Sequence, residues 1–386
     1  MNKYEIAEIK KIIQKEDHIL TRIAGCYVDA EKEKRTTFSH PFFSLSEEET
    51  NRYLDILRKS MSGTLAKNLI SMDFPLEEER KENGPAKRLQ NMRSSKLEDE
   101  ELLQFFYDDV IESYPNDSNY LILLVHGAYD VPVINTDGTK NDTSDEIYDF
   151  ILCSLCPLKL TKPALYYNKI DNQIEDSPRD WVVQAPLNGF LYPAFNNRST
   201  DIHSLLFYTK NASEEEIDFC KELLACDMPI TYKEQKETFQ TILEDSLGES
   251  CDTDTVKHIH VELNEMVEQN KENPEPLTLG VPEFTHLLSE AGVENEHIEK
   301  AKESFEEHVG SHKSLAATNI ASLRKFEVTT PDVKIQVNPD RSDLVETKVI
   351  DGIPCIVIEC NDTVEINGIR VANPGFHRDE EGSDTP

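Results

Sequence analysis

The sequence predicts an α+β protein: a central, mostly antiparallel sheet with flanking helices, plus a small C-terminal β unit. Three observations lead to this prediction. Apolar residues recur at helical spacing before residue 115 and again between 213 and 312. Short apolar runs separated by Pro, Asn and Gly fill 115–212, which favours hairpins over β–α–β units. From Phe326 onward the apolar period returns to two.

These patterns divide the chain into five expected segments. Residues 1–114 form a helical N-terminal region with a hairpin, and 115–212 form the central antiparallel sheet. Residues 213–312 form a helical segment, 325–372 the C-terminal β unit, and 373–386 a disordered tail.

The N-terminal region opens with an expected amphipathic helix over 2–15. A hairpin is expected over 19–38, where two apolar runs flank a charged turn. Ser46 and Glu49 form a capping-box pattern that begins a second helix, and a third is expected over 97–113. The first helix carries four isoleucines at helical spacing, which are Ile6, Ile9, Ile12 and Ile13.

The central segment begins with a buried strand, which the aliphatic run of Tyr120 to His126 predicts. A loop is expected over 133–145, with Asp137 and Gly138 as its turn. Near the C-terminus, Asp351-Gly352 and Asn367-Gly368 predict hairpin turns. Further strands of the central sheet are expected over 147–155, 164–168, 181–184, 190–194 and 204–209.

The charge balance bears on the class of partner. With 74 acidic and 40 basic residues, the formal net charge is -34. Because nucleic-acid binding depends on cations that neutralise phosphates, direct binding of nucleic acid is not expected. The acidic surface serves solubility, or else it docks a basic partner or mimics nucleic acid. The partner is therefore expected to be an unidentified protein or small molecule.

The compartment follows from what the sequence contains. The longest aliphatic run, Leu121 to Val125, is far shorter than the roughly 20 residues that cross a bilayer, so no membrane association is expected. The N-terminus shows no secretory signal. Eight scattered cysteines fit buried thiols in a reducing compartment, and Cys153 and Cys156 are interpreted as packing thiols. We expect a cytoplasmic protein.

The polar insert at 196–203 is the main candidate site. Asp201 and His203 stand two apart, so on an extended backbone their side chains would point the same way. A carboxylate beside an imidazole can act as acid and base or hold a metal. His126 and Asp130 would join them as catalytic candidates if the strands are neighbours.

The same insert offers three candidates for ligand binding, Asn196, Arg198 and Thr200. Arg198 could hold a phosphate or carboxylate in its planar fork, if a turn brings it round. A structural alternative stands beside this one, because Asn, Ser, Thr and Asp also stabilise turns and caps, and an Arg in an acidic chain often forms a salt bridge.

Four stretches of the chain together resemble a known family. They are 22–29 (RIAGCYVD), 120–132 (YLILLVHGAYDVP), 198–203 (RSTDIH) and 338–347 (NPDRSDLVET). The chain resembles, over nearly its whole length, an uncharacterised bacterial family known only as a domain of unknown function. The resemblance implies a bacterial protein and carries no activity over.

Two functions remain open. The first is an acidic cytosolic binding or regulatory protein of unknown ligand, in which His203→Ala would leave stability intact and weaken binding. The second is a metal-assisted phosphoester hydrolase, with His126, Asp130, Asp201 and His203 as metal ligands or acid/base groups and Arg198 on the phosphate. A divalent metal is expected only for the hydrolase, which requires these side chains to converge.

Overall fold

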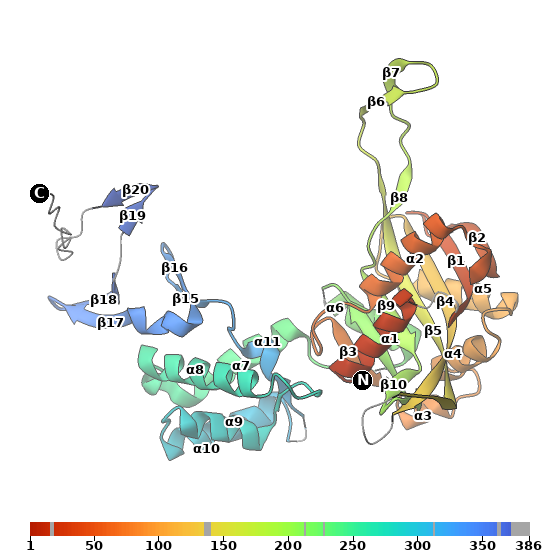
Figure 1. The fold of residues 1–386 in the computed structure, drawn as a ribbon. Coiled ribbons are helices and arrows are strands. Elements are labelled where there is room, and N and C mark those ends of the chain that lie inside the picture. Colours follow the sequence, from red (N-terminus) through yellow and green to blue (C-terminus); the bar gives the residue numbers. More distant parts are fainter. Residues whose placement is uncertain are drawn as a thin grey trace, which may run out of the picture. The chain divides into compact units, whose positions relative to one another are not determined.

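The computed structural model describes residues 1–15, 19–134, 140–211, 214–226, 228–311, 313–360 and 364–371. The chain forms two units (Figure 1). Unit 1 comprises Met1–Thr238 and Glu272–Thr278, and unit 2 comprises Phe239–Lys271 and Leu279–Pro386. The expected disordered tail at 373–386 and the expected turn at Asp137-Gly138 lie outside the described residues.

Unit 1 is built on a large antiparallel sheet, which confirms the predicted α+β class. Its strand order is β2-β1-β4-β5-β9-β12-β3, and each neighbouring pair is antiparallel. Three of these strands precede residue 115, so the sheet extends beyond the segment in which we expected it. The strands are β1 (Leu20–Val28), β2 (Lys34–Pro41), β3 (Leu69–Asp73), β4 (Tyr120–Ile134), β5 (Lys140–Leu160), β9 (Asn188–Tyr192) and β12 (Ser204–Thr209).

The two central strands, β4 and β5, are longer than predicted. The expected loop over 133–145 is wrong at both ends, because β4 runs to Ile134 and β5 begins at Lys140. The pairing of Pro132 with Ser144 and of Ile134 with Lys140 continues the ladder there. Backbone hydrogen bonds between strands do not require apolar side chains, so polar turn-forming residues can lie in paired strands.

Helices cover both faces of the sheet. On face A, α5 shares a core with the sheet, and Phe106 packs edge-on against Phe190. On face B, the isoleucines of α1 share a core with Leu123 and Phe150. Burial on both faces explains why β4 begins with an unbroken aliphatic run. The helices are α4 (Pro85–Ser94), α5 (Glu100–Ser113) and α6 (Glu214–Leu224) on face A, α1 (Lys3–Lys15) and α2 (Glu47–Ser60) on face B, and the short α3 (Leu76–Glu79) and η2 (Phe42–Ser44).

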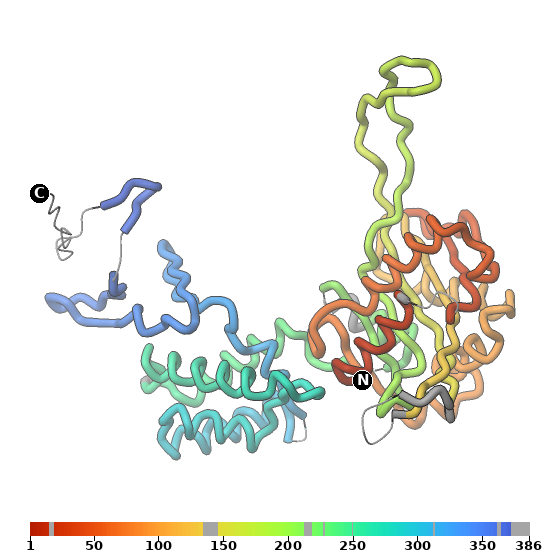
Figure 2. Tube along the Cα trace, in the orientation of Figure 1, coloured from red at the N-terminus to blue at the C-terminus, as the bar shows by residue number. Residues whose placement is uncertain are grey.

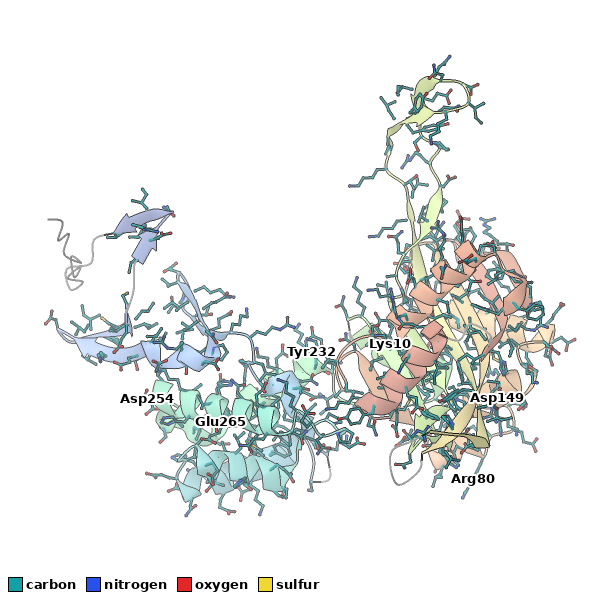
Figure 3. The ribbon with its side chains drawn as sticks, viewed as in Figure 1. Lys10, Arg80, Asp149, Tyr232, Asp254 and Glu265 are labelled. Carbon is teal, nitrogen blue, oxygen red and sulfur yellow. The ribbon has the colours of Figure 1, made fainter. Side chains whose placement is uncertain are left out.

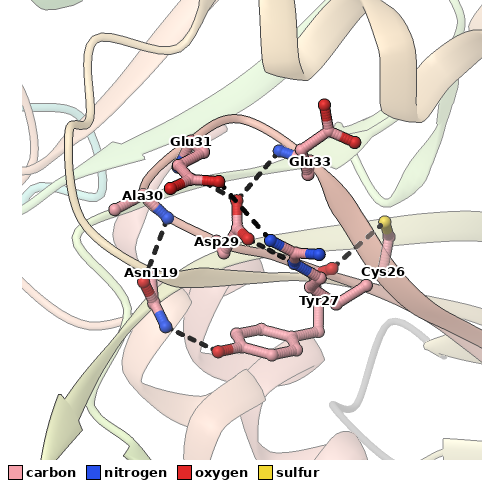
Figure 4. Close-up of polar contacts among 8 residues, drawn as sticks. Cys26, Tyr27, Asp29, Ala30, Glu31, Glu33 and Asn119 are labelled. Carbon is pink, nitrogen blue, oxygen red and sulfur yellow. Dashed lines mark hydrogen bonds and ion pairs between the residues drawn. The ribbon is translucent and has the colours of Figure 1, made fainter.

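The predicted hairpin β1–β2 is confirmed, and a local network closes its turn (Figure 4). The Asp29 carboxylate accepts hydrogen bonds from the backbone N–H groups of Glu31 and Glu33, each at 3.0 Å, and pairs with Arg35. The bond from Glu33 lowers the pKa of Asp29 below its usual value. Asn119 joins the turn to the start of β4. Asp29, the acidic residue of the stretch 22–29 that resembles the family, therefore has a structural role.

Beyond the sheet, β5 and β8 (Trp181–Val183) continue into an arm, defined here as residues 158–183 (Figure 2). Leu158 pairs with Val183 at its base. Farther out, β6 (Leu165–Asn168) pairs with β7 (Gln173–Asp176) in a separate two-stranded ladder. The strand expected over 164–168 thus forms outside the central sheet, because its partner is β7.

Unit 2 combines helices with small strand pairs, and its hairpin turns at Asp351-Gly352 and Asn367-Gly368 are confirmed by four positive φ angles. No helix in the described part of either unit is long and apolar enough to cross a membrane. The remaining elements are α7 (Tyr232–Leu247), η3 (Gly248–Ser250), α8 (Thr253–Gln269), β13 (Thr278–Leu279), α9 (Val281–Glu290), α10 (Asn295–His308), β14 (Leu315–Ala316), α11 (Ala317–Ile320), β15 (Phe326–Thr329), β16 (Lys334–Val337), η4 (Pro339–Leu344), β17 (Val345–Ile350), β18 (Ile353–Ile358), β19 (Val364–Ile366) and β20 (Ile369–Val371).

Candidate functional site

The polar insert of unit 1 folds into a tight hairpin of its own. β10 (Ala194–Asn196) pairs with β11 (Ser199–Asp201), and the two residues between them have positive φ angles of 52° at Asn197 and 56° at Arg198. Two consecutive left-handed residues form the turn that suits a two-residue hairpin. The insert therefore turns back on itself at Arg198.

Arg198 is held by a carboxylate of the protein itself. Its Nε and Nη2 atoms donate to the two carboxylate oxygens of Glu8 on α1, both at 3.0 Å, and Nη2 also donates to the carbonyl of Pro132 at 3.0 Å. Tyr129 donates its hydroxyl to the same carboxylate. The bonded Glu8 raises the pKa of the Arg198 guanidinium above its usual value. Most of the planar fork is thus occupied by an internal ion pair.

Asp201 and His203 do not lie on one extended strand, so the condition for their side chains to point the same way is not met. The backbone turns after Asp201, and its carboxylate accepts a hydrogen bond from the backbone N–H of His203 at 3.0 Å. The other carboxylate oxygen accepts bonds from Asn196 at 2.6 Å and Ser204 at 2.7 Å. An Asp that bonds the backbone two residues ahead stabilises a turn, which replaces the extended backbone we assumed.

The surroundings of Asp201 and His203 shift their pKa values in opposite directions. Burial raises the pKa of Asp201, but the hydrogen bonds from Ser204 and Asn196 outweigh it and leave the pKa below its usual value. The imidazole of His203 is 68% exposed, and its Nδ1 lies 2.7 Å from a carboxylate oxygen of Glu79 on α3. The hydrogen bond to Glu79 raises the pKa of His203.

Thr200, the third ligand-binding candidate, also has an internal partner. Its backbone N–H donates to Glu146 of β5 at 2.7 Å, and the Ser199 hydroxyl donates to the same carboxylate. Burial raises the pKa of Glu146, whereas these bonds lower it, and the net pKa lies below the usual value. The insert is therefore fastened to β5 by Glu146 and to α1 by Glu8.

His126 lies in a separate cluster on face A. It alternates along β4 with Ile122 and Leu124, which belong to the face A core, and its side chain is fully buried. The hydroxyl of Thr21 lies 2.6 Å from its Nδ1, where the register between β1 and β4 shifts. Its Nε2 lies 2.6 Å from Oδ1 of Asp149, without the alignment of a hydrogen bond.

A hydroxyl, an imidazole and a carboxylate in sequence can activate a nucleophile where substrate reaches them. Here the imidazole is completely enclosed, and the carboxylate of Asp149 is only 31% exposed. The three side chains connect β1, β4 and β5 on one face of the sheet. We interpret Thr21, His126 and Asp149 as a polar cross-link, in which Thr21 bonds Nδ1 of the buried histidine and the Asp149 carboxylate lies beside Nε2.

The structure does not bring the five residues of the predicted hydrolase site together. Arg198 bonds Glu8, which also accepts a bond from Tyr129 on the side covered by α1, whereas His126 faces the opposite side. Asp130 is exposed on β4 opposite Ile147. Among the described residues, no group of three or more His, Cys, Asp or Glu side chains could hold a metal ion.

Nothing in the amino-acid pattern pointed to the residues that bond these candidates. Glu8, Glu79 and Glu146 look like ordinary surface acids in an acidic chain, and Thr21 and Asp149 belong to strand-like runs. The one available signal was the alternation in β5, since Asp149 stands in register with the apolar Ile151 and Cys153 of face A. A charged residue in such a register needs a buried partner.

The arm carries a second kind of candidate surface, made of exposed apolar and aromatic side chains. Ile170 at its tip is 93% exposed, and Trp181, the one tryptophan of the sequence, is 48% exposed. Large apolar side chains gathered on an exposed surface mark interaction sites more often than single ones do. The full set in the arm is Leu165, Tyr166, Tyr167, Ile170, Ile174, Trp181 and Val182.

The comparison with known families matches the resemblance seen in the sequence. The family described as Domain of unknown function (DUF4317) matches residues 1–369, which is nearly the whole chain. The chain therefore belongs to this family. No curated protein matches the sequence.

Proposed function

We propose that this member of an uncharacterised family acts as a binding protein, and that its arm docks into an apolar cleft of a partner protein. The observation that carries the proposal is the exposed apolar and aromatic surface of residues 165–182. It is supported by the candidate catalytic residues, each of which is buried or bonded within the fold or stands apart from the others.

The composition of the arm suits a protein interface. Tyrosine and tryptophan bury a large area with few rotatable bonds, and both are enriched among the residues that dominate binding energy. Tyr166, Tyr167 and Trp181 supply three such rings within the arm. Ile170 adds a purely apolar tip between β6 and β7. Burial of these side chains in a complementary cleft would remove apolar surface from water.

The charge distribution favours a basic partner. The whole chain has a net charge of -34, but the arm has none, because four basic and four acidic side chains balance. The field of the chain attracts basic surfaces and speeds their encounter, while the neutral arm adds no local repulsion to the contact. The eight residues are Lys159, Lys162, Lys169, Arg179, Asp171, Glu175, Asp176 and Asp180.

The proposal places this binding protein in the cytoplasm of a bacterium. All eight cysteines are free thiols, which fits a reducing compartment. The alternative, a metal-assisted hydrolase, gains no support from the geometry, because its residues lie in separate clusters on two faces of the sheet.

The test compares three proteins in a lysate of the native host: the wild type, Ile170→Asp and Phe43→Ser. Phe43 is the matched control, since it is a large apolar side chain, 84% exposed, on η2 outside the arm. We expect the wild type and the control to capture the same protein, and Ile170→Asp to lose it. The affinity for the purified partner should fall about tenfold or more, because a buried charge would replace an apolar contact.

Two results would contradict the proposal. One is capture of the same protein with equal affinity by all three forms. The other is a homo-oligomer, seen by native mass spectrometry of the wild type alone and lost in Ile170→Asp, which would make a second copy the occupant of the arm. Equal unfolding midpoints for the three proteins exclude misfolding as the cause.

A further inference from the structure

Unit 2 contains a cavity of about 550 Å³, far in sequence from the arm. One wall is a single face of α8, because its lining residues stand at positions i, i+3, i+4 and i+7 of the helix. The apolar face of α8 is a different one, formed by Ile259, Leu263 and Val267, and it packs into the unit. The lining residues of α8 are Asp254 (Figure 3), Lys257, His258 and Val261.

The opposite wall comes from η4 and the beginning of β17. Ser342 and Asp343 line it from η4, and Glu346, Thr347 and Lys348 line it from β17. Lys257 fixes the two walls together, since its ammonium donates to the backbone carbonyl of Val345, a buried residue of β17. Its side chain is only 11% exposed, so this cation is held in place before any ligand arrives.

The two walls differ in charge. The α8 wall offers two nitrogen donors, Lys257 and His258, and its one carboxylate, Asp254, lies 3.9 Å from Lys257 and is largely exposed. The wall of η4 and β17 offers the carboxylates of Asp343 and Glu346. Their cationic neighbours, Arg341 and Lys348, are themselves half exposed, and exposed ion pairs of this kind contribute little and exchange readily.

This distribution suits a ligand of a single charge less well than one that carries both charges. A simple anion would face Asp343 and Glu346, and a simple cation would face Lys257. A ligand with both charges can match both walls, and the hydroxyls of Ser342 and Thr347 add hydrogen-bonding groups. The volume lies within the roughly 300–1,000 Å³ that is typical of small-molecule sites.

We propose that this cavity binds a small zwitterion of the amino-acid class, with its carboxylate toward Lys257 and His258 and its ammonium toward Asp343 and Glu346. This site is independent of the arm. It adds a small-molecule ligand to a protein whose partner docks on unit 1, and either proposal can fail while the other stands.

The experiment is isothermal titration of the full chain with a panel of the standard free L-amino acids. The tightest binder is then compared with its N-acetyl derivative, which lacks the ammonium, and its amide, which lacks the carboxylate. We expect saturable binding of the parent and a loss of about tenfold for each derivative, because each lacks one charge-assisted contact.

Substitutions in the two walls show which wall contacts the carboxylate of the ligand and which contacts its ammonium. In His258→Gln the penalty for the amide should shrink, and in Glu346→Gln the penalty for the N-acetyl derivative should shrink. His258 is exposed on α8, so its substitution keeps the fold. Lys300→Met is the control, because Lys300 forms an exposed pair with Glu296 on α10, outside the cavity.

Three results would overturn the inference: no saturable binding of any amino acid, derivatives that bind as tightly as their parent, or wall variants that behave like Lys300→Met.

Discussion

Strand β5 passes through two environments, the helix-covered sheet and the exposed arm, and the two differ in how far their side chains are buried. Between Tyr148 and Leu155 it lies in the sheet, where helices cover both faces and the large side chains are buried. From Leu158 onward β5 leaves the sheet and pairs with β8 in the arm, and farther out Ile170 is 93% exposed. Strand-forming sequence is common to both parts. We therefore expect the covered part of the hairpin to provide most of the stability and the arm to contribute little.

The largest expected effect separates these two parts directly. Phe207 of β12 is fully buried in the face A core, so Phe207→Ala should lower the free energy of unfolding by about 3–5 kcal/mol through lost burial and a cavity. Ile170→Ala in the arm should change it by less than about 0.5 kcal/mol. Urea unfolding followed by far-UV circular dichroism measures both. Tryptophan fluorescence is unsuitable, because Trp181 reports on the arm.

A similar loss of stability in both variants would contradict the comparison, because it would mean that the arm packs against something in the folded protein. An unchanged free energy of unfolding in Phe207→Ala would also contradict the comparison, because the packed sheet would then not be what stabilises the protein.

Local patterns in the sequence predicted the elements well where a few neighbouring residues determine the conformation. The run from Tyr120 to His126 predicted a buried strand, and Asp351-Gly352 and Asn367-Gly368 predicted the turns that form. Ser46 and Glu49 predicted the capping box at the start of α2. In each case the reason lies within a few residues of the chain.

The candidate site could not be predicted in the same way, because its partners are distant in sequence. Arg198 bonds a residue 190 positions away, His203 one 124 away and His126 one 105 away. These pairs depend on which strands and helices become neighbours, and β1 and β3 join the sheet from outside the segment we expected. The sequence showed residues able to do chemistry, but only the topology shows that each of the three has its partner elsewhere in the fold.

The next prediction tests whether His126 helps to stabilise the part of the sheet that the helices cover. His126→Ala removes a buried ring and its contacts with Thr21 and Asp149, so the free energy of unfolding should fall by about 2–4 kcal/mol. Asp149→Asn keeps the shape and should cost less, on the order of 1 kcal/mol. Equilibrium unfolding in urea is the measurement. A His126→Ala variant as stable as the wild type would rule out the structural cross-link.

A smaller effect distinguishes two residues of the same insert. Arg198→Met leaves Glu8 without its cation in a mostly buried position, so a loss of about 1–3 kcal/mol is expected. His203→Ala removes an imidazole that is 68% exposed, and the loss should stay below about 0.5 kcal/mol. Thermal unfolding of the pair at pH 7 provides the comparison, and equal losses would show that exposure does not decide the outcome.

The smallest expected effect is the contribution of Asp201 to the free energy of unfolding, which is present near neutral pH and lost in acid. Its pKa in the folded protein lies below the unfolded value of about 3.9, because the bonds from Ser204 and Asn196 outweigh burial. A group whose pKa is lowered by folding stabilises the protein above the unfolded pKa, and this stabilisation is lost as the pH falls through the folded pKa. Asp201→Asn should therefore cost on the order of 1 kcal/mol at pH 6, and the difference from wild type should narrow below about pH 4.

Asp130→Asn is the matched control for this prediction, because Asp130 is exposed on β4 in the same unit and carries the same charge. The urea midpoint of Asp130→Asn, followed from pH 6 to about pH 3, gives the effect of removing one negative charge at an exposed position. If both variants give the same pH profile, net charge alone explains the effect, and the bonds around Asp201 do not hold the insert. If only Asp201→Asn converges with the wild type in acid, the carboxylate that we first considered for catalysis contributes instead to the stability of the turn.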